Sequence, residues 1–75
     1  MIRPEYISLN NWAGSLLVDY PDYTLPQLMS EERWTEWAVD LLSVAPFRGK
    51  NIPAPKNDQD WTEWARIVYM VMQKR

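Results

Sequence analysis

The ionisable side chains that share a helical spacing are the first candidates for chemistry. Glu36 and Asp40 stand four residues apart, so a helix would place both carboxylates on one face. Such a pair could hold a cation or act as acid and base, but far more often it is a solvated helix surface. Arg33 with Glu36, and Glu63 with Arg66, have the i, i+3 spacing of surface ion pairs, worth roughly 0.2–0.5 kcal/mol each.

Most of the groups that enzymes use are missing from the sequence. The 75 residues include no histidine and no cysteine, which removes the commonest general base, the commonest metal ligand and the thiol nucleophile. The serines have no base in a recognised arrangement, and two glycines cannot make a glycine-rich phosphate loop. We therefore expect no enzyme activity, no catalytic residue, no cofactor and no metal site.

Charge and hydropathy narrow the possible partners. Eight basic and ten acidic residues give a formal net charge of −2, which argues against a nucleic-acid binder because phosphate contacts need a concentrated basic patch. The longest apolar run, residues 67–72, is far shorter than the roughly 20 residues that span a bilayer. The N-terminal residues do not resemble a signal peptide. We expect a soluble protein made in the cytoplasm, with no membrane contact.

The sequence contains an internal repeat built around tryptophan, of which it has five. Residues 34–38 (WTEWA) recur as residues 61–65, 27 positions later (34 to 61). Both copies are preceded at equal offsets by an aliphatic residue and a proline. A degenerate copy lies 25 positions upstream of the first (9 to 34), with these residues in the corresponding places: Leu9, Trp12, Ala13, Leu16 and Leu17.

The spacing within each copy predicts an α-helix. The apolar positions step by 3, 1, 3 and 1, which places them on one helix face. We expect helices at about residues 5–19, 30–45 and 58–73, with repeat copies at about 25–45 and 52–72. The predicted fold is all-α: a single domain over residues 1–75, a small three-helix unit with extended proline-rich connectors.

Residues that cap helices support these boundaries. Ser30 is a good N-cap for the second helix, and Asn57 or Asp58 can cap the third, with Asp60 in its first turn. Pro21 and Pro46 lie just past the ends of the first two helices. Lys74 and Arg75 would complement the C-terminal end of the third helix.

Two uses of the tryptophans stay open: a core of indoles, which bury about 150–250 Å² each, or anchors for a partner. One residue of each motif can point inward while the first tryptophan, in the first helical turn, clamps the incoming proline segment. The predicted core residues are Trp12, Trp37, Trp64, Leu16, Leu41 and Val68. The candidates for partner binding or packing are Trp34, Trp61, Pro53, Pro55, Phe47, Ile67, Met70 and Val71.

The proline segment, polar cap and W-x-x-W-A helix of residues 52–65, and less closely of residues 24–42, resemble segments of small structural proteins of tailed bacteriophages. The resemblance implies a minor virion component of the head, neck or tail, present in many copies and made in the host cytoplasm. It implies that the partners are other virion proteins and copies of the chain itself, and that no active-site residues exist. The alternative is a small regulatory or inhibitor protein that binds a single host or phage protein.

Overall fold

The protein consists of three successive units, each an extended arm followed by a helix. A computed structural model describes residues 1–73. The helices are α1 (Leu9–Asp19), α2 (Trp34–Leu42) and α3 (Trp61–Gln73), with short 3-10 turns at Pro4–Tyr6 and Glu31–Arg33. No strand occurs among these residues, so the predicted all-α fold with three helices is confirmed.

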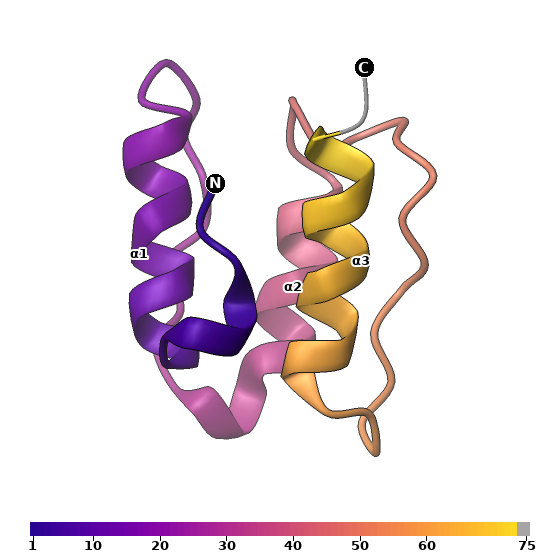
Figure 1. Ribbon diagram of the computed structural model, residues 1–75. Helices are drawn as coiled ribbons and strands as arrows, with labels where there is room; N and C mark the ends of the chain where they lie inside the picture. The colour runs from indigo at the N-terminus through magenta and orange to yellow at the C-terminus, as the bar shows by residue number, and fades with distance from the viewer. Residues whose placement is uncertain (74–75) are drawn as a thin grey trace.

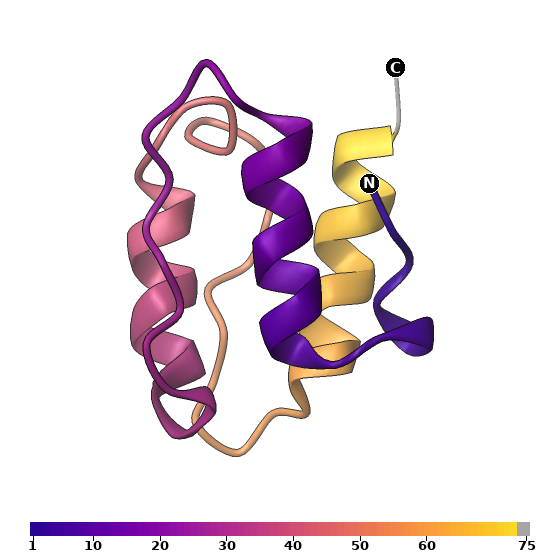
Figure 2. The ribbon, with the colours of Figure 1, turned by 90° about the vertical axis from the view of Figure 1, so that its left-hand side faces the viewer.

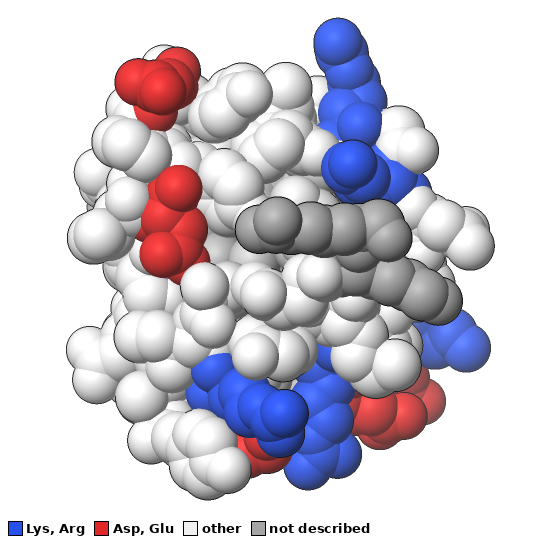
Figure 3. Space-filling view, turned by 45° about the horizontal axis from the view of Figure 1, so that its top comes forward, with Lys and Arg blue, Asp and Glu red and all other residues white. Residues whose placement is uncertain are grey.

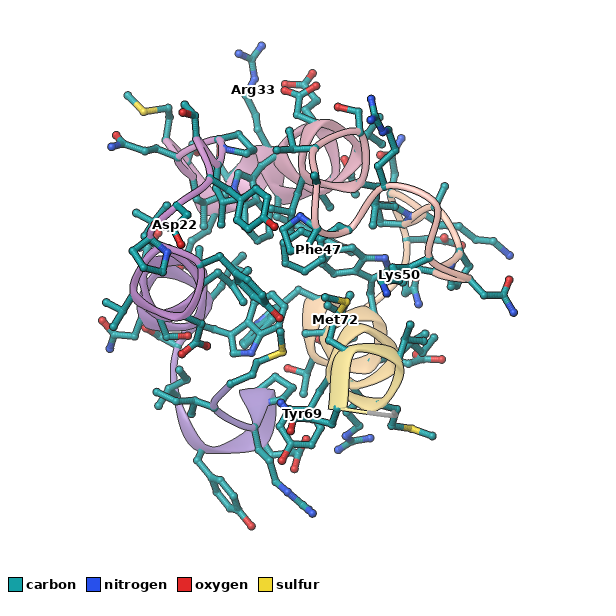
Figure 4. All side chains as sticks on the ribbon, turned by 90° about the horizontal axis from the view of Figure 1, so that it is seen from above. Asp22, Arg33, Phe47, Lys50, Tyr69 and Met72 are labelled. Carbon is teal, nitrogen blue, oxygen red and sulfur yellow. The ribbon has the colours of Figure 1, made fainter. Side chains whose placement is uncertain are left out.

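The three helices run in the same direction, because each connector returns along the length of the bundle before the next helix begins (Figures 1 and 2). Seen from above, the helices stand at the corners of a triangle, and an arm lies in each gap between two of them (Figure 4). The first arm lies between α1 and α3, the second between α1 and α2, and the third between α2 and α3. The structure therefore repeats around a pseudo-threefold axis.

The centre of this triangle is made of one tryptophan from each helix. The ring centroids of Trp12, Trp37 and Trp64 are 6.3, 6.3 and 6.2 Å apart, with interplanar angles of 80°, 80° and 76°. All three pairs therefore meet edge to face, the arrangement that the quadrupole of an aromatic ring favours, at about 0.5–1.5 kcal/mol per pair beyond area burial. The alanine after each tryptophan is also buried and leaves room for the neighbouring helices.

Each central indole also holds the arm of its own unit. The Nε1–H of Trp37 donates to the carbonyl oxygen of Pro26 at 3.0 Å, and that of Trp64 donates to Pro53 at the same distance. Trp12 donates to the carbonyl of Ile2 at 2.9 Å. A buried indole N–H needs an acceptor, and a carbonyl on an extended arm receives no donor from a helix or sheet. One side chain thus satisfies both requirements in each unit.

The first position of each motif reaches across to another unit. The ring centroid of Trp34 lies 5.8 Å from that of Trp64, and the ring centroid of Trp61 lies 6.2 Å from that of Trp12, with tilted rings in both pairs. The third equivalent position holds Leu9, which is buried. The second unit therefore contacts the third, and the third contacts the first, through these outer indoles. A buried leucine takes the equivalent position in the first unit.

The first helix begins later than the sequence predicted. Residues 5–8 are not α-helical: Pro4–Tyr6 forms a 3-10 turn, and Ser8 is the N-cap, its hydroxyl accepting from the Asn11 backbone N–H at 3.3 Å. The reason is that Pro4 opens a 3-10 turn within the first arm and Ile7 after it is extended, so the α-helix starts only after the Ser8 cap. The second helix also starts later, since Glu31–Arg33 is a 3-10 turn and Ser30 makes no capping bond with its side chain.

The helices also end and cap differently from the prediction. Residues 43–45 leave α2 in a turn, because Pro46 disfavours helical backbone at Ala45 and the turn brings Phe47 into the core. Asp60, rather than Asn57 or Asp58, caps α3 by accepting from the Thr62 backbone N–H at 3.2 Å. Gln73 stands where α1 and α2 are followed by Pro21 and Pro46, so α3 continues to nine residues past its central tryptophan, against seven in α1 and five in α2. The predicted role of Lys74 and Arg75 lies outside the described residues.

Removing an indole N–H should test the arm attachment. Trp37→Phe and Trp64→Phe should each lower the free energy of unfolding by about 1–3 kcal/mol, because a carbonyl loses its donor while an aromatic ring remains. Chemical denaturation gives the value. Trp61→Phe is the matched control, since residues 1–73 show no acceptor for its N–H, and it should cost less. Equal losses for all three variants would mean that ring size, not the hydrogen bond, matters.

Replacing each of the two glycines by alanine should change the free energy of unfolding in opposite directions. Gly14 lies within α1 and a Cβ there would meet no atom within 4 Å, so Gly14→Ala should raise the unfolding free energy by about 1 kcal/mol. Gly49 has a φ of +83°, so Gly49→Ala should lower it by about 1–2 kcal/mol. Denaturation midpoints of the two variants check this, and stabilisation by both would contradict it.

Candidate functional site

The residues predicted to form the core lie together in one buried cluster. Trp12, Trp64, Leu16, Leu41 and Val68 are nearly or fully inaccessible, and Trp37 is buried with them. They come from all three helices and fill the inside of the triangle. None of these side chains is available to a partner.

Several candidates for partner binding pack within the molecule. Trp34 is only 9% exposed and Phe47 only 1%, its ring lying 5.3 Å from that of Tyr20. Trp61 is half-buried against the core. Trp34 and Trp61 were expected to clamp the proline arm, but the hydrogen bonds to the arms come from the indole N–H groups of Trp37 and Trp64. The inward tryptophan carries the N–H that must find an acceptor, and the arm supplies it.

Three of the accessible candidates lie on α3. Met70 is 67% exposed, and Ile67 and Val71 are half-buried. An apolar depression of about 430 Å³ opens at the C-terminal end of α3, lined by Tyr69, Met70, Val71 and Gln73. It is a wide, open surface rather than an enclosed cavity.

A second depression of about 240 Å³ shares Tyr69 and Met70 with the first and adds charge. The first arm supplies Arg3, whose guanidinium carbon lies 5.5 Å from the centroid of the Tyr69 ring. Arg66 lies with its Nε 3.3 Å from an oxygen of Glu5. We call the two depressions together the α3 groove. Its rim carries two arginines and one glutamate, a formal charge of +1 (2 − 1).

Sequence reasoning missed the contribution of the first arm to this groove. The predicted pair was Glu63 with Arg66, but Arg66 instead pairs with Glu5 across 61 residues. A sequence signal for it is that a proline also precedes the first repeat copy, although Pro4 lies eight residues before Trp12, whereas Pro26 and Pro53 lie eleven before Trp37 and Trp64. The pair Arg33 with Glu36 does form on the surface, at 3.7 Å.

The proline candidates lie elsewhere. Pro53 lines a separate, more polar depression of about 370 Å³ together with Lys56, Asp58, Gln59 and Glu63, and Pro55 is half-buried in the same arm. The structure therefore does not bring the proline candidates together with Met70 and Val71. Within residues 1–73, no three or more potential metal-ligating side chains gather, and Glu36 and Asp40 share a shallow polar surface with Arg33.

A second accessible surface lies at the C-terminal end of α1. Val18 is 78% exposed, Tyr23 is exposed, and Asp22 lies between them in the turn that follows the helix. The Met1 amino nitrogen lies 3.4 Å from a carboxylate oxygen of Asp19. We call Val18, Asp19, Asp22 and Tyr23 the acidic corner. On the face shown in Figure 3, acidic side chains lie at the left, and basic ones lie at the upper right and along the lower edge, where further acidic side chains are also seen.

Comparison with known proteins gives no relative from which a role could be transferred. No family model, curated protein or solved structure matches the chain. Among residues 1–73, no helix has the length and apolar character that crossing a membrane requires.

The half-buried Tyr20, beside the acidic corner, should make the unfolding free energy depend on pH. Burial, with a smaller contribution from Asp19, raises the pKa of Tyr20. Unfolded tyrosine ionises at about pH 10, so the unfolded chain loses this proton first. The stabilisation is complete below that pH and is lost as pH rises through the folded pKa.

Denaturation across alkaline pH tests this expectation. The unfolding free energy of the wild type should fall above about pH 10, and Tyr20→Phe should reduce that fall. Tyr6→Phe, at an exposed ring, should keep the wild-type slope. If Tyr20→Phe and wild type lose stability in parallel, Tyr20 does not contribute to the pH dependence.

Proposed function

We propose that this protein is a non-enzymatic interaction protein that docks on other proteins, most specifically as a minor component of a bacteriophage virion. The observation that carries the proposal is the exposed apolar surface of α3, where Met70 is 67% exposed above an apolar depression. Contiguous apolar surface on a small protein typically marks a contact with another molecule.

The packing of the core supports this interpretation. The indole triangle and its surrounding aliphatic residues form a continuous cluster without Met70. The side chain of Met70 therefore adds little to the fold, and its apolar character needs another explanation. Methionine is flexible and polarizable, which suits a contact that must adapt to a partner's shape.

The virion assignment rests on the resemblance of the W-x-x-W-A segments to small structural proteins of tailed phages. The geometry is compatible with such a role, because each segment packs as one arm and one helix in a body with principal extents of 28 × 24 × 21 Å. Repeated copies of a small module can be held by neighbours in a symmetric assembly.

Mass spectrometry of purified particles tests the proposal. A phage that encodes this chain should carry it at constant copy number per particle after density-gradient purification. Met70→Glu should lower its incorporation at least about tenfold, because a buried, unpaired charge at a contact is costly. Val39→Glu, an apolar-to-acid change at an exposed residue of α2, should leave incorporation unchanged.

The contrary outcome would point to the regulatory alternative. If the chain is absent from particles and is instead recovered in a one-to-one complex with a single non-structural protein, the virion role is excluded. Incorporation that is equally insensitive to Met70→Glu and Val39→Glu would remove α3 as the docking surface.

A further inference from the structure

We propose that the α3 groove binds the acidic corner of a second copy of this chain, in a head-to-tail contact. The proposal deepens the proposed function and rests on it, because it names one of the partners of an assembling protein. The two surfaces differ in charge and share apolar character, so each offers what the other lacks.

The charges of the two surfaces are complementary. Arg3 and Arg66 stand at the rim of the groove, and Arg66 remains more than half exposed although it pairs with Glu5. The corner presents Asp22, which makes no ion pair with any residue in 1–73. A carboxylate that approaches guanidinium groups gains charge-assisted hydrogen bonds and geometric specificity.

The apolar groups are complementary as well. Val18 projects from the last turn of α1, and Tyr23 is held beside Tyr20 by a backbone hydrogen bond of 3.2 Å and an edge-to-face ring contact. The corner is therefore a fixed apolar projection with a carboxylate. The groove offers Tyr69, Met70 and Val71 as an apolar floor. A pre-ordered projection loses little entropy when it binds.

The two surfaces lie on different sides of the molecule. In the end-on view, Asp22 lies where α1 turns into the second arm, whereas Tyr69 lies between the first arm and α3 (Figure 4). One molecule therefore cannot satisfy its own groove with its own corner. Two copies that paired both patches reciprocally would close as a twofold dimer, whereas one contact per pair leaves a free groove and a free corner, so that further copies add to an open chain or a closed ring. The proposed contact is the second arrangement.

Other acidic apolar segments fit less well. Met29 is exposed near Glu31 and Glu32, but these two carboxylates occupy the first turn of a helical segment, a position where negative charge favours the helix. Asp22 has no such role. This difference favours the acidic corner and supplies a control for it.

Sedimentation velocity of the full-length protein tests the proposal. From about 10 µM to about 1 mM, the weight-average mass should rise from 8.9 kDa to more than twice that value, and should fall back in about 0.5 M salt. Met70→Glu should block the groove and Asp22→Lys the corner, each weakening association at least about tenfold. Val39→Glu and Glu32→Lys, with the same charge changes elsewhere, should associate like the wild type.

A mixture of the two blocked variants gives the decisive result. Met70→Glu keeps an intact corner and Asp22→Lys keeps an intact groove, so the mixture should form particles of twice 8.9 kDa and none larger. A monomer at every concentration in low salt would overturn the proposal, as would disruption by Glu32→Lys instead of Asp22→Lys. A mixture that stays monomeric, or wild-type dimers that never grow, would also overturn it. Incorporation into particles without self-association would leave the proposed function standing and exclude this partner.

Discussion

The fold depends on one arrangement of the indole ring, used three times. Each central tryptophan places its ring edge to face with two others and points its N–H at the carbonyl of its own arm. The ring contacts hold the helices together, and the hydrogen bond holds the arm against its helix. Because the two contacts come from the same side chain, helix packing and arm position are coupled, and neither can change without the other.

This arrangement explains how a chain of 75 residues without disulfide or histidine forms a core. A domain of this size buries only roughly 60% of the surface that its unfolded chain exposes, which is less than a larger domain buries, so each buried side chain must cover a large area. Indoles provide that area, and the alanine after each one allows the helices to approach. The arms complete the enclosure, since each covers the gap between two helices.

The departures from threefold symmetry create the accessible surfaces. Where the first two helices are followed by proline, Gln73 continues α3, and the apolar depression lies at this C-terminal end of the helix. The first arm, which precedes the degenerate copy of the motif, brings Arg3 and Glu5 to the same place. The accessible surfaces thus lie where the three units differ, while the positions that the units share build the core.

The sequence by itself determined the helix count, the all-α class and the buried position of the second motif tryptophan, because these follow from local periodicity and repetition. It also pointed to Met70 and Val71, since apolar residues around the whole of a helix exceed what one core can cover. Only the tertiary structure decided that Trp34 and Phe47 are buried, that Trp37 and Trp64 bond the arms, and that Arg3 and Glu5 meet α3. The physical reason is that these contacts join residues up to 61 positions apart. Their partners are set by the path along which the three arms return between parallel helices, and local spacing in the sequence does not encode that path.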